Sequence, residues 1–212
     1  RWRPVSGAEH LYLHVPFCSR RCSYCDFAIA VRRTVPVKAF IDAVMAELAL
    51  RAVAATPHHF STVYLGGGTP SKLGEDGVTQ LMHRLRDEAG IELDAAAEVT
   101  LEANPEDVTP SACAAWRASG VNRLSLGVQT FDERALAWMH RTHSASRSRE
   151  AVASARVAGI PDISLDLIFA LPEELDRRWA DDLTEVLSLG ADHLSLYGLT
   201  VEDRTPVGRW VA

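Results

Sequence analysis

The stretch LYLHVPFCSRRCSYCDF, residues 11–27, places an apolar run rich in β-forming residues directly before three closely spaced cysteines. Residues 11–17 predict a strand, and Cys18, Cys22 and Cys25 follow in a C-x3-C-x2-C spacing. Loops this short rarely allow disulfide geometry without distortion, so the spacing favours metal ligands. A structural zinc site usually takes four protein ligands. The stretch therefore points to a group that takes three thiolates and keeps one position open.

Outward from this stretch, strand-like and helical patterns alternate along the whole chain. Strands are predicted at 11–17, 62–68, 98–104, 123–129, 163–171 and 193–200. Helices are predicted at 36–55, 75–89, 110–119 with a stop at Gly120, 132–140, 146–158 and 176–188. The alternation predicts an α/β fold of parallel strands that are buried on both faces. Two architectures fit, an open doubly wound sheet and a barrel-like array.

The composition bounds the class of protein. The 212 residues suit one domain, and the net charge of −6 argues against a nucleic-acid surface. The sequence has no run long enough to span a membrane and no secretory apolar segment near residue 1. We expect a cytoplasmic protein in which residues 1–212 form one core domain that precedes a C-terminal domain. Cys113, within helical ACAAW, is interpreted as a packed thiol.

Polar groups recur where the predicted strands end. They are Gly66, Gly67, Gly68 and Thr69 after the second strand, Glu102 on the third, Gln129 on the fourth, Asp166 within the fifth and Tyr197 on the sixth. In parallel α/β folds the ligand site lies at the carboxyl ends of the strands. The sequence therefore predicts one composite site at that rim.

Thiolates bind zinc and iron–sulfur clusters. For zinc, Asp26 or the pair His58–His59 would have to supply the fourth ligand. On a cubane cluster, three thiolates would leave one iron without a protein ligand, and that iron could bind a substrate or cofactor directly. The second alternative explains why three cysteines are enough.

The cysteine spacing, with Tyr24 before the last cysteine, resembles the signature of the radical S-adenosylmethionine (SAM) superfamily. The resemblance implies a full or partial TIM barrel, often of six βα units, with a 4Fe-4S cluster whose open iron chelates SAM. The segments VYLGGGTPS, VTLEANPEDV, GVNRLSLGVQTF, RTHSA, LDLIFALPE and SLYGLTVEDRTP are similar to successive motifs of its HemN/HemW group. That group contains oxygen-independent coproporphyrinogen III dehydrogenases and HemW-type heme chaperones.

The resemblance also implies site residues. Cys18, Cys22 and Cys25 would hold the cluster, and SAM would contact Tyr12, Tyr24, Gly67, Gly68, Thr69, Glu102, Gln129, Arg141 and Asp166, with Tyr197 and Thr200 as weaker candidates. The alternative for Asp166 is a core acid that caps a neighbouring loop, and the alternative for Arg141 is a solvated charge at a helix end. An acid inside an apolar strand is costly unless it is paired or used.

One position separates the two branches of the group. The dehydrogenases typically carry a further cysteine two residues after the third cluster cysteine, where this chain has Phe27. The resemblance therefore favours a HemW-like chaperone that binds heme or porphyrin and delivers heme to acceptor proteins, with peripheral membrane contact left open. The alternatives are a coproporphyrinogen III dehydrogenase, a radical SAM enzyme with another substrate such as RNA, and a zinc-stabilised binding domain. Ala170 departs from the group, which more often has glycine before Leu-Pro.

Overall fold

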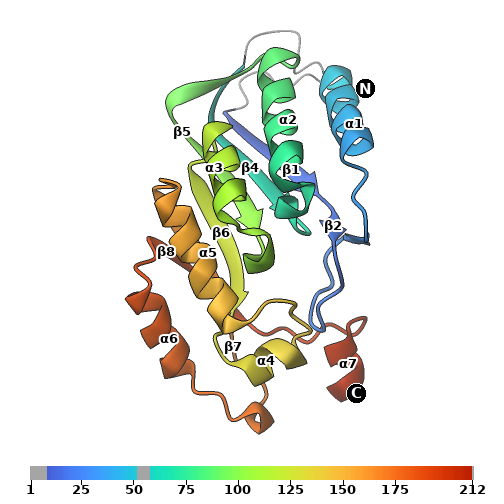
Figure 1. Ribbon diagram of the computed structural model, residues 1–212. Helices are drawn as coiled ribbons and strands as arrows, with labels where there is room; N and C mark the ends of the chain where they lie inside the picture. Colours follow the sequence, from blue (N-terminus) through green and yellow to red (C-terminus); the bar gives the residue numbers. More distant parts are fainter. Residues whose placement is uncertain (1–8, 52–57, 212) are drawn as a thin grey trace.

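The computed structural model describes residues 9–51 and 58–211 and is built on one six-stranded parallel sheet (Figure 1). Its strands are β1 (His10–Val15), β4 (His58–Gly67), β5 (Ile91–Ala103), β6 (Arg123–Gln129), β7 (Asp162–Phe169) and β8 (His193–Gly198). They pair in that same order. A doubly wound sheet would reverse its order at a switch point, whereas here each new strand joins the same edge. The predicted α/β fold is confirmed, and the barrel-like array is the architecture present.

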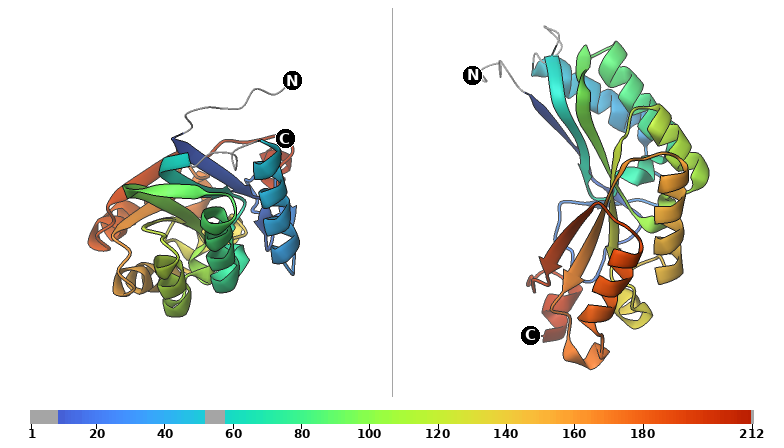
Figure 2. Two further views of the ribbon diagram at one scale, coloured as in Figure 1. Left: turned by 90° about the horizontal axis from the view of Figure 1, so that it is seen from above. Right: turned by 90° about the vertical axis from the view of Figure 1, so that its left-hand side faces the viewer.

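Helices cover one face of this sheet. They are α1 (Val37–Leu50), α2 (Gly74–Asp87), α3 (Pro110–Ala118), α5 (Ala145–Val157) and α6 (Trp179–Ser188). Figure 2 shows them on the outer side of the curved sheet, with the inner side open. The shorter α4 (Glu133–Trp138) and α7 (Pro206–Val211) lie beyond the carboxyl ends of the strands (Figure 1). Thr109, Asp132 and Ser144 accept hydrogen bonds from the first turns of α3, α4 and α5, which fixes where these helices begin.

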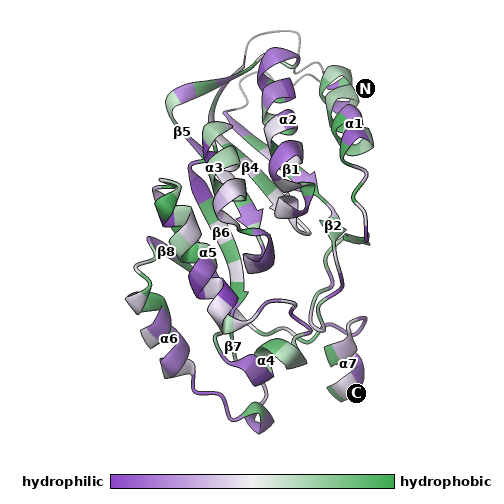
Figure 3. Ribbon diagram, in the orientation of Figure 1, coloured by the Kyte–Doolittle hydropathy of each residue, from purple (hydrophilic) through white to green (hydrophobic). Residues whose placement is uncertain are grey.

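The two faces of the sheet differ in polarity. The helix-covered face contributes fully buried residues to the main core: Val15, Leu65, Leu101, Leu124 and Leu165. The open face carries Tyr12, Tyr64, Glu102, Ser125 and Asp166 on five successive strands. This alternation appears in Figure 3 as purple and green segments along the strands. The prediction that the strands are buried on both faces is confirmed for the middle strands, where the inner-face residues Thr100, Ser125 and Ser164 are buried. It fails at the edge strand β1, where Tyr12 is 56% exposed.

Several boundaries differ from the sequence prediction. The strands β4 and β5 begin earlier than predicted, where His58–Phe60 pair with Ile91–Leu93, and a bulge follows between Phe60 and Thr62. Helix α6 begins at Trp179 because Asp176 adopts a left-handed conformation (φ 51°) after the short 3-10 helix η4 (Glu173–Leu175). The predicted stop at Gly120 is confirmed by its φ of 104°, a conformation that favours glycine. Residues 52–55 of the predicted first helix lie outside the described residues.

Short elements complete the rim where the strands end. The strands β2 (Phe17–Cys18) and β3 (Ala30–Val31) form a separate parallel pair, and the 3-10 helices η2 (Pro70–Leu73) and η3 (Pro105–Asp107) follow β4 and β5. Neither the β2–β3 pair nor α7 was predicted from the sequence. None of the described helices is long and apolar enough to cross a membrane.

Candidate functional site

A cavity of about 400 Å³ opens at the carboxyl ends of the strands. This size is within the range of small-molecule and cofactor pockets. Its walls come from the loop of residues 18–29, here called the cysteine loop, and from the ends of five strands. Predicted site residues that line it are Cys18, Cys22, Tyr24, Cys25, Gly67, Gly68, Thr69, Glu102, Gln129, Arg141 and Asp166, together with Tyr197 and Thr200. The structure thus brings together residues that are spread over most of the chain.

The cysteine loop is anchored at both of its ends. The amide of Ala30 donates to Pro16 O at 2.7 Å, and that of Arg32 donates to Cys18 O at 2.9 Å. Within the loop, the buried Ser23 amide donates to Met139 O at 3.1 Å, and Arg21 Nη1 donates to Cys25 O at 3.0 Å. The loop is therefore held in place by backbone contacts rather than by its thiols.

The three thiols of the loop are free and half-buried. Cys18 Sγ lies 3.4 Å from Thr69 Oγ1, the first residue after the glycines. Burial raises the pKa of the Cys18 and Cys25 thiols. A bound metal reverses this effect, since a coordinating thiol is deprotonated outright. The donor set therefore suits an iron–sulfur group.

Two glycines leave room beside the thiols. A Cβ on Gly68 would lie 2.8 Å from Pro16 O and 3.0 Å from Cys18 Sγ. Gly67 has a φ of 124°, and its Cβ would lie 2.9 Å from Val15 O. Any side chain at either position would collide with backbone, so glycine is required for β4 to pass this close to the cysteine loop.

Glu102 faces the same space from β5. Its carboxylate accepts hydrogen bonds from Tyr64 Oη at 2.8 Å and from the Gly67 amide at 2.9 Å. Burial raises the pKa of Glu102, and these two donors offset part of that effect. Glu102 is thus a fixed acceptor at the glycine segment, suited to a ligand's ammonium group or hydroxyls.

Asp166 lies on β7 at the same rim. Both of its carboxylate oxygens accept from Ser125 Oγ, at 3.0 and 3.1 Å. Burial raises the pKa of Asp166 to about 6, despite hydrogen bonds from Ser195 and Ser125. A strongly shifted carboxyl group in a cavity is typical of a functional site.

Arg141 is not a solvated charge at a helix end. Its Nη2 donates to Asn104 Oδ1 and to Gly127 O, both at 2.7 Å, and its Nη1 points to Cys22 Sγ at 3.5 Å. Its Nε is buried and has no hydrogen-bond partner among the described residues. The residue itself lines the same cavity as the thiols. Because an arginine side chain stays protonated, it brings a fixed positive charge to the cavity wall.

The other predicted residues are placed as follows. Gln129 ends β6 with a φ of 67°, and Tyr24 lies between Cys22 and Cys25 beside Arg141, where burial raises its pKa. Tyr12 does not line the cavity. Its ring stacks on Tyr64 with centroids 5.9 Å apart, and its hydroxyl lies 3.2 Å from His14 Nδ1. A direct contact between Tyr12 and a cofactor stays a prediction.

Sequence reasoning missed several residues of the cavity, among them Asn104, Ser125, Gly127 and His140. Strand periodicity could have identified two of them. Ser125 is the β6 partner of Glu102 on β5, and Ser125 and Gly127 lie on the same face of the sheet as Glu102. Asn104 and His140 lie in loops, where no periodic pattern applies.

The zinc alternative is not supported by the positions of the histidines. His58 and His59 begin β4, about 30 Å along the strand from the cavity. His59 instead pairs with Glu92 at 3.2 Å and Asp94 at 3.8 Å. Among the described residues, no group of three or more His, Cys, Asp or Glu side chains is arranged to hold a single ion. A cubane differs in this respect, since each of its thiolates binds a different iron.

Several known proteins are similar to this chain. The family model of the radical SAM superfamily matches residues 12–186. The heme chaperone HemW of Mycobacterium tuberculosis (strain ATCC 25618 / H37Rv) is 40% identical, over 98% of this chain and 54% of the relative. HemW of Escherichia coli (strain K12) is 35% identical, over 93% of this chain and 52% of the relative. The chain spans about half the length of the curated relatives it matches.

A solved structure gives the same picture. Coproporphyrinogen III oxidase (HemN) from Escherichia coli, described as a radical SAM enzyme, aligns with a TM-score of 0.84 at 30% identity. The alignment covers 94% of this chain and 46% of HemN. The sheet and its helices therefore correspond to the HemN core.

Proposed function

The chain belongs to the radical SAM superfamily, and from this premise we propose that it is the core domain of a HemW-like heme chaperone that binds a 4Fe-4S cluster and SAM. The observation that carries the proposal is the cavity in which three free thiols meet a glycine segment that tolerates no side chain. The HemW relatives support the chaperone part. Phe27, at a position where the dehydrogenases typically carry a fourth cysteine, supports it as well.

In this proposal Cys18, Cys22 and Cys25 hold the cluster. When bound, the cluster supplies the electron for reductive cleavage of SAM. The chain's own groups hold the cofactor: Glu102 and the backbone of Gly67 and Gly68 receive the ammonium group, and Arg141 the carboxylate. These pairings follow from charge and hydrogen-bond type.

The remaining predicted contacts suit the nucleoside part of SAM. Asp166 and Gln129 offer acceptors for ribose hydroxyls, and Tyr24 and Thr69 complete the wall nearest the thiols. Because the thiols are free in a chain with no disulfide among the described residues, we also propose a cytoplasmic location.

Heme is the proposed cargo, and heme-accepting proteins are the proposed partners. A second function has one observation in its favour, since HemN is a coproporphyrinogen III oxidase and its core aligns closely with this chain. That alternative is oxidative decarboxylation of porphyrinogen propionates.

The first experiment tests the cofactors. The chain is reconstituted anaerobically with iron and sulfide, and iron, sulfide, zinc and bound SAM are measured. We expect about four iron and four sulfide per chain and SAM binding that depends on all three cysteines. Zinc without iron or acid-labile sulfide would overturn the proposal in favour of a zinc-stabilised domain.

The second experiment separates chaperone from enzyme. The longer protein that contains this core is reconstituted, then tested for heme binding, for heme transfer to an acceptor and for vinyl formation from coproporphyrinogen III. We expect heme transfer without vinyl product. Clear decarboxylation would contradict the chaperone function and favour the dehydrogenase.

A further inference from the structure

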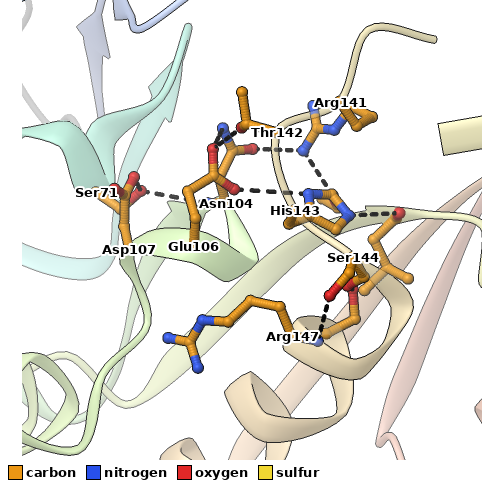
Figure 4. A network of polar contacts seen from close by, with 12 residues as sticks. Ser71, Asn104, Glu106, Asp107, Arg141, Thr142, His143, Ser144 and Arg147 are labelled. Carbon is orange, nitrogen blue, oxygen red and sulfur yellow. Dashed lines mark hydrogen bonds and ion pairs between the residues drawn. The ribbon is translucent and has the colours of Figure 1, made fainter. Parts of the chain in front are cut away.

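A partly buried polar network reaches from the cavity wall into the loop after α4, as Figure 4 shows. It begins at Arg141, whose guanidinium points to Cys22 Sγ at 3.5 Å and is held by Asn104 Oδ1 at 2.7 Å. Arginine is only a donor, so Asn104 must present its carbonyl oxygen to it. The side-chain NH2 of Asn104 then has to find an acceptor on its other side.

Glu106 is that acceptor. Asn104 Nδ2 lies 3.4 Å from Glu106 Oε1, and the Thr142 hydroxyl donates to the same oxygen. Burial alone would raise the pKa of Glu106, but its contacts with His143 and Thr142 lower it to about 2. The ionised carboxylate only accepts hydrogen bonds. It therefore allows one orientation of the Asn104 amide, the one that serves Arg141.

His143 lies behind Glu106. Its side chain is fully buried, and its Nδ1 lies 3.5 Å from Glu106 Oε2. Its Nε2 lies 3.1 Å from Val128 O, a carbonyl that can only accept, so Nε2 carries a hydrogen. The loop that carries Arg141 is thus attached to Glu106 by the hydrogen bond from Thr142, the next residue along the chain. Glu106 Oε2 and His143 Nδ1 have no hydrogen-bond partner among the described residues.

We propose that Glu106 is a positioning residue that fixes the Asn104 amide and thereby holds the Arg141 guanidinium against Cys22. This inference rests on the proposed function, because its consequence concerns the cluster and SAM. Positive charge and N–H donors near a cluster sulfur raise the reduction potential of the cluster. Loss of Glu106 therefore lowers that potential and weakens the binding of SAM.

The test compares Glu106→Ala with Glu106→Gln in the reconstituted chain. Glutamine keeps an acceptor oxygen for Asn104 and Thr142, whereas alanine removes it. We expect alanine to raise the Kd of SAM about tenfold, the lower end of the usual cost of losing a supporting residue, and to shift the cluster potential to more negative values. Glutamine should stay within about twofold of the unmutated chain in Kd. Equilibrium dialysis and an EPR-monitored redox titration provide the two readouts. Equal values for all three chains would overturn the inference.

A double variant separates positioning from a general structural role. In an Arg141→Met background, Glu106→Ala should change neither readout further, because the residue that Glu106 positions is gone. An additive effect would contradict the inference. If Glu106→Ala fails to fold by circular dichroism, Asn104→Ala interrupts the same network in front of Glu106 and should lower the potential in the same way.

The outcomes distinguish this inference from the proposed function. An unmutated chain that assembles no cluster would overturn both. An unmutated chain with a cluster and bound SAM, whose Glu106→Ala and Asn104→Ala forms have the same potential and Kd, would overturn only the role of Glu106.

Discussion

At the scale of the residue, Asp166 is held in a site that disfavours its charge. Its pKa is raised to about 6, mainly by burial. A raised carboxyl pKa stabilises the fold below the unfolded pKa of about 3.9, and this contribution is lost as the pH rises towards 6. Asp166→Asn should therefore be more stable than the unmutated chain at pH 7, by about 3 kcal/mol, and nearly equal to it at pH 4.

Urea unfolding of the iron-free chain at the two pH values measures this difference. The Ser125 hydroxyl can donate to the asparagine carbonyl as it does to Asp166, so the hydrogen bond is preserved. A stability difference that does not change between pH 4 and pH 7 would show that Asp166 is not held in a site that raises its pKa.

Gly68 makes a second prediction at this scale. In Gly68→Ala the methyl group would meet Pro16 O and Cys18 Sγ at 2.8 and 3.0 Å, so the cysteine loop has to move. We expect the iron and sulfide content after reconstitution to fall to less than half. Gly90→Ala is the control, because nothing lies within 4 Å of its added Cβ and it does not line the cavity. It should assemble a normal cluster, although its φ of 63° costs about 1 kcal/mol of stability.

At the scale of the element, the sequence predicted six strands and six helices at nearly the right places, because apolar periodicity marks elements that pack on a core. It failed where pairing, and not periodicity, makes the strand. Ile91–Leu93 form the start of β5 because His58–Phe60 of β4 pair with them, and the strand continues through residues 94–97, which lie at the bulge. The β2–β3 pair has the same cause, since two residues on each side carry no pattern.

Helix α6 supplies a prediction of its own. Its buried Asp182 accepts from Thr130 Oγ1 at 2.8 Å, the Phe131 amide at 2.7 Å and Arg177 Nε at 2.7 Å. These contacts tie the helix to the end of β6. Asp182→Ala leaves the Arg177 guanidinium buried without its partner, and we expect a loss of about 3–5 kcal/mol in the free energy of unfolding.

Glu185 on the same helix is the matched control. It pairs with Arg149 at 2.6 Å, but both side chains are partly exposed, so Glu185→Ala should cost less than about 1 kcal/mol. Urea unfolding measures both variants. Equal losses would show that Asp182 is not the anchor between α6 and β6.

At the scale of the whole molecule, parallel strands explain why most of the site was predictable. The carboxyl ends of all six strands meet at one rim. The convergence of residues such as Glu102, Gln129 and Asp166 can therefore be predicted before their contacts are known. What the sequence could not show was which of them face each other across loops. The contacts of Asn104 and Glu106 could not be predicted, because they depend on how the loop after α4 packs against η3.

The same architecture separates folding from cofactor binding. The main core lies between the sheet and its helices, and of the four cysteines it contains only Cys113. Backbone hydrogen bonds attach the cysteine loop to the core, and the thiols take no part in them. A variant in which Cys18, Cys22 and Cys25 are all alanine should therefore keep the circular dichroism and the cooperative unfolding of the iron-free chain.

The triple variant should at the same time lose all cluster absorbance and all SAM-dependent stabilisation. Binding of a ligand to the folded state alone raises stability by about 2.7 kcal/mol at a hundredfold excess over Kd, so SAM should raise the Tm of the reconstituted chain and leave the Tm of the triple variant unchanged. A Cys113→Ala variant is the control, because it keeps the three ligands and should retain the shift. If the triple variant unfolds, the cysteine loop is part of the folding unit and the cofactor site cannot be separated from the core.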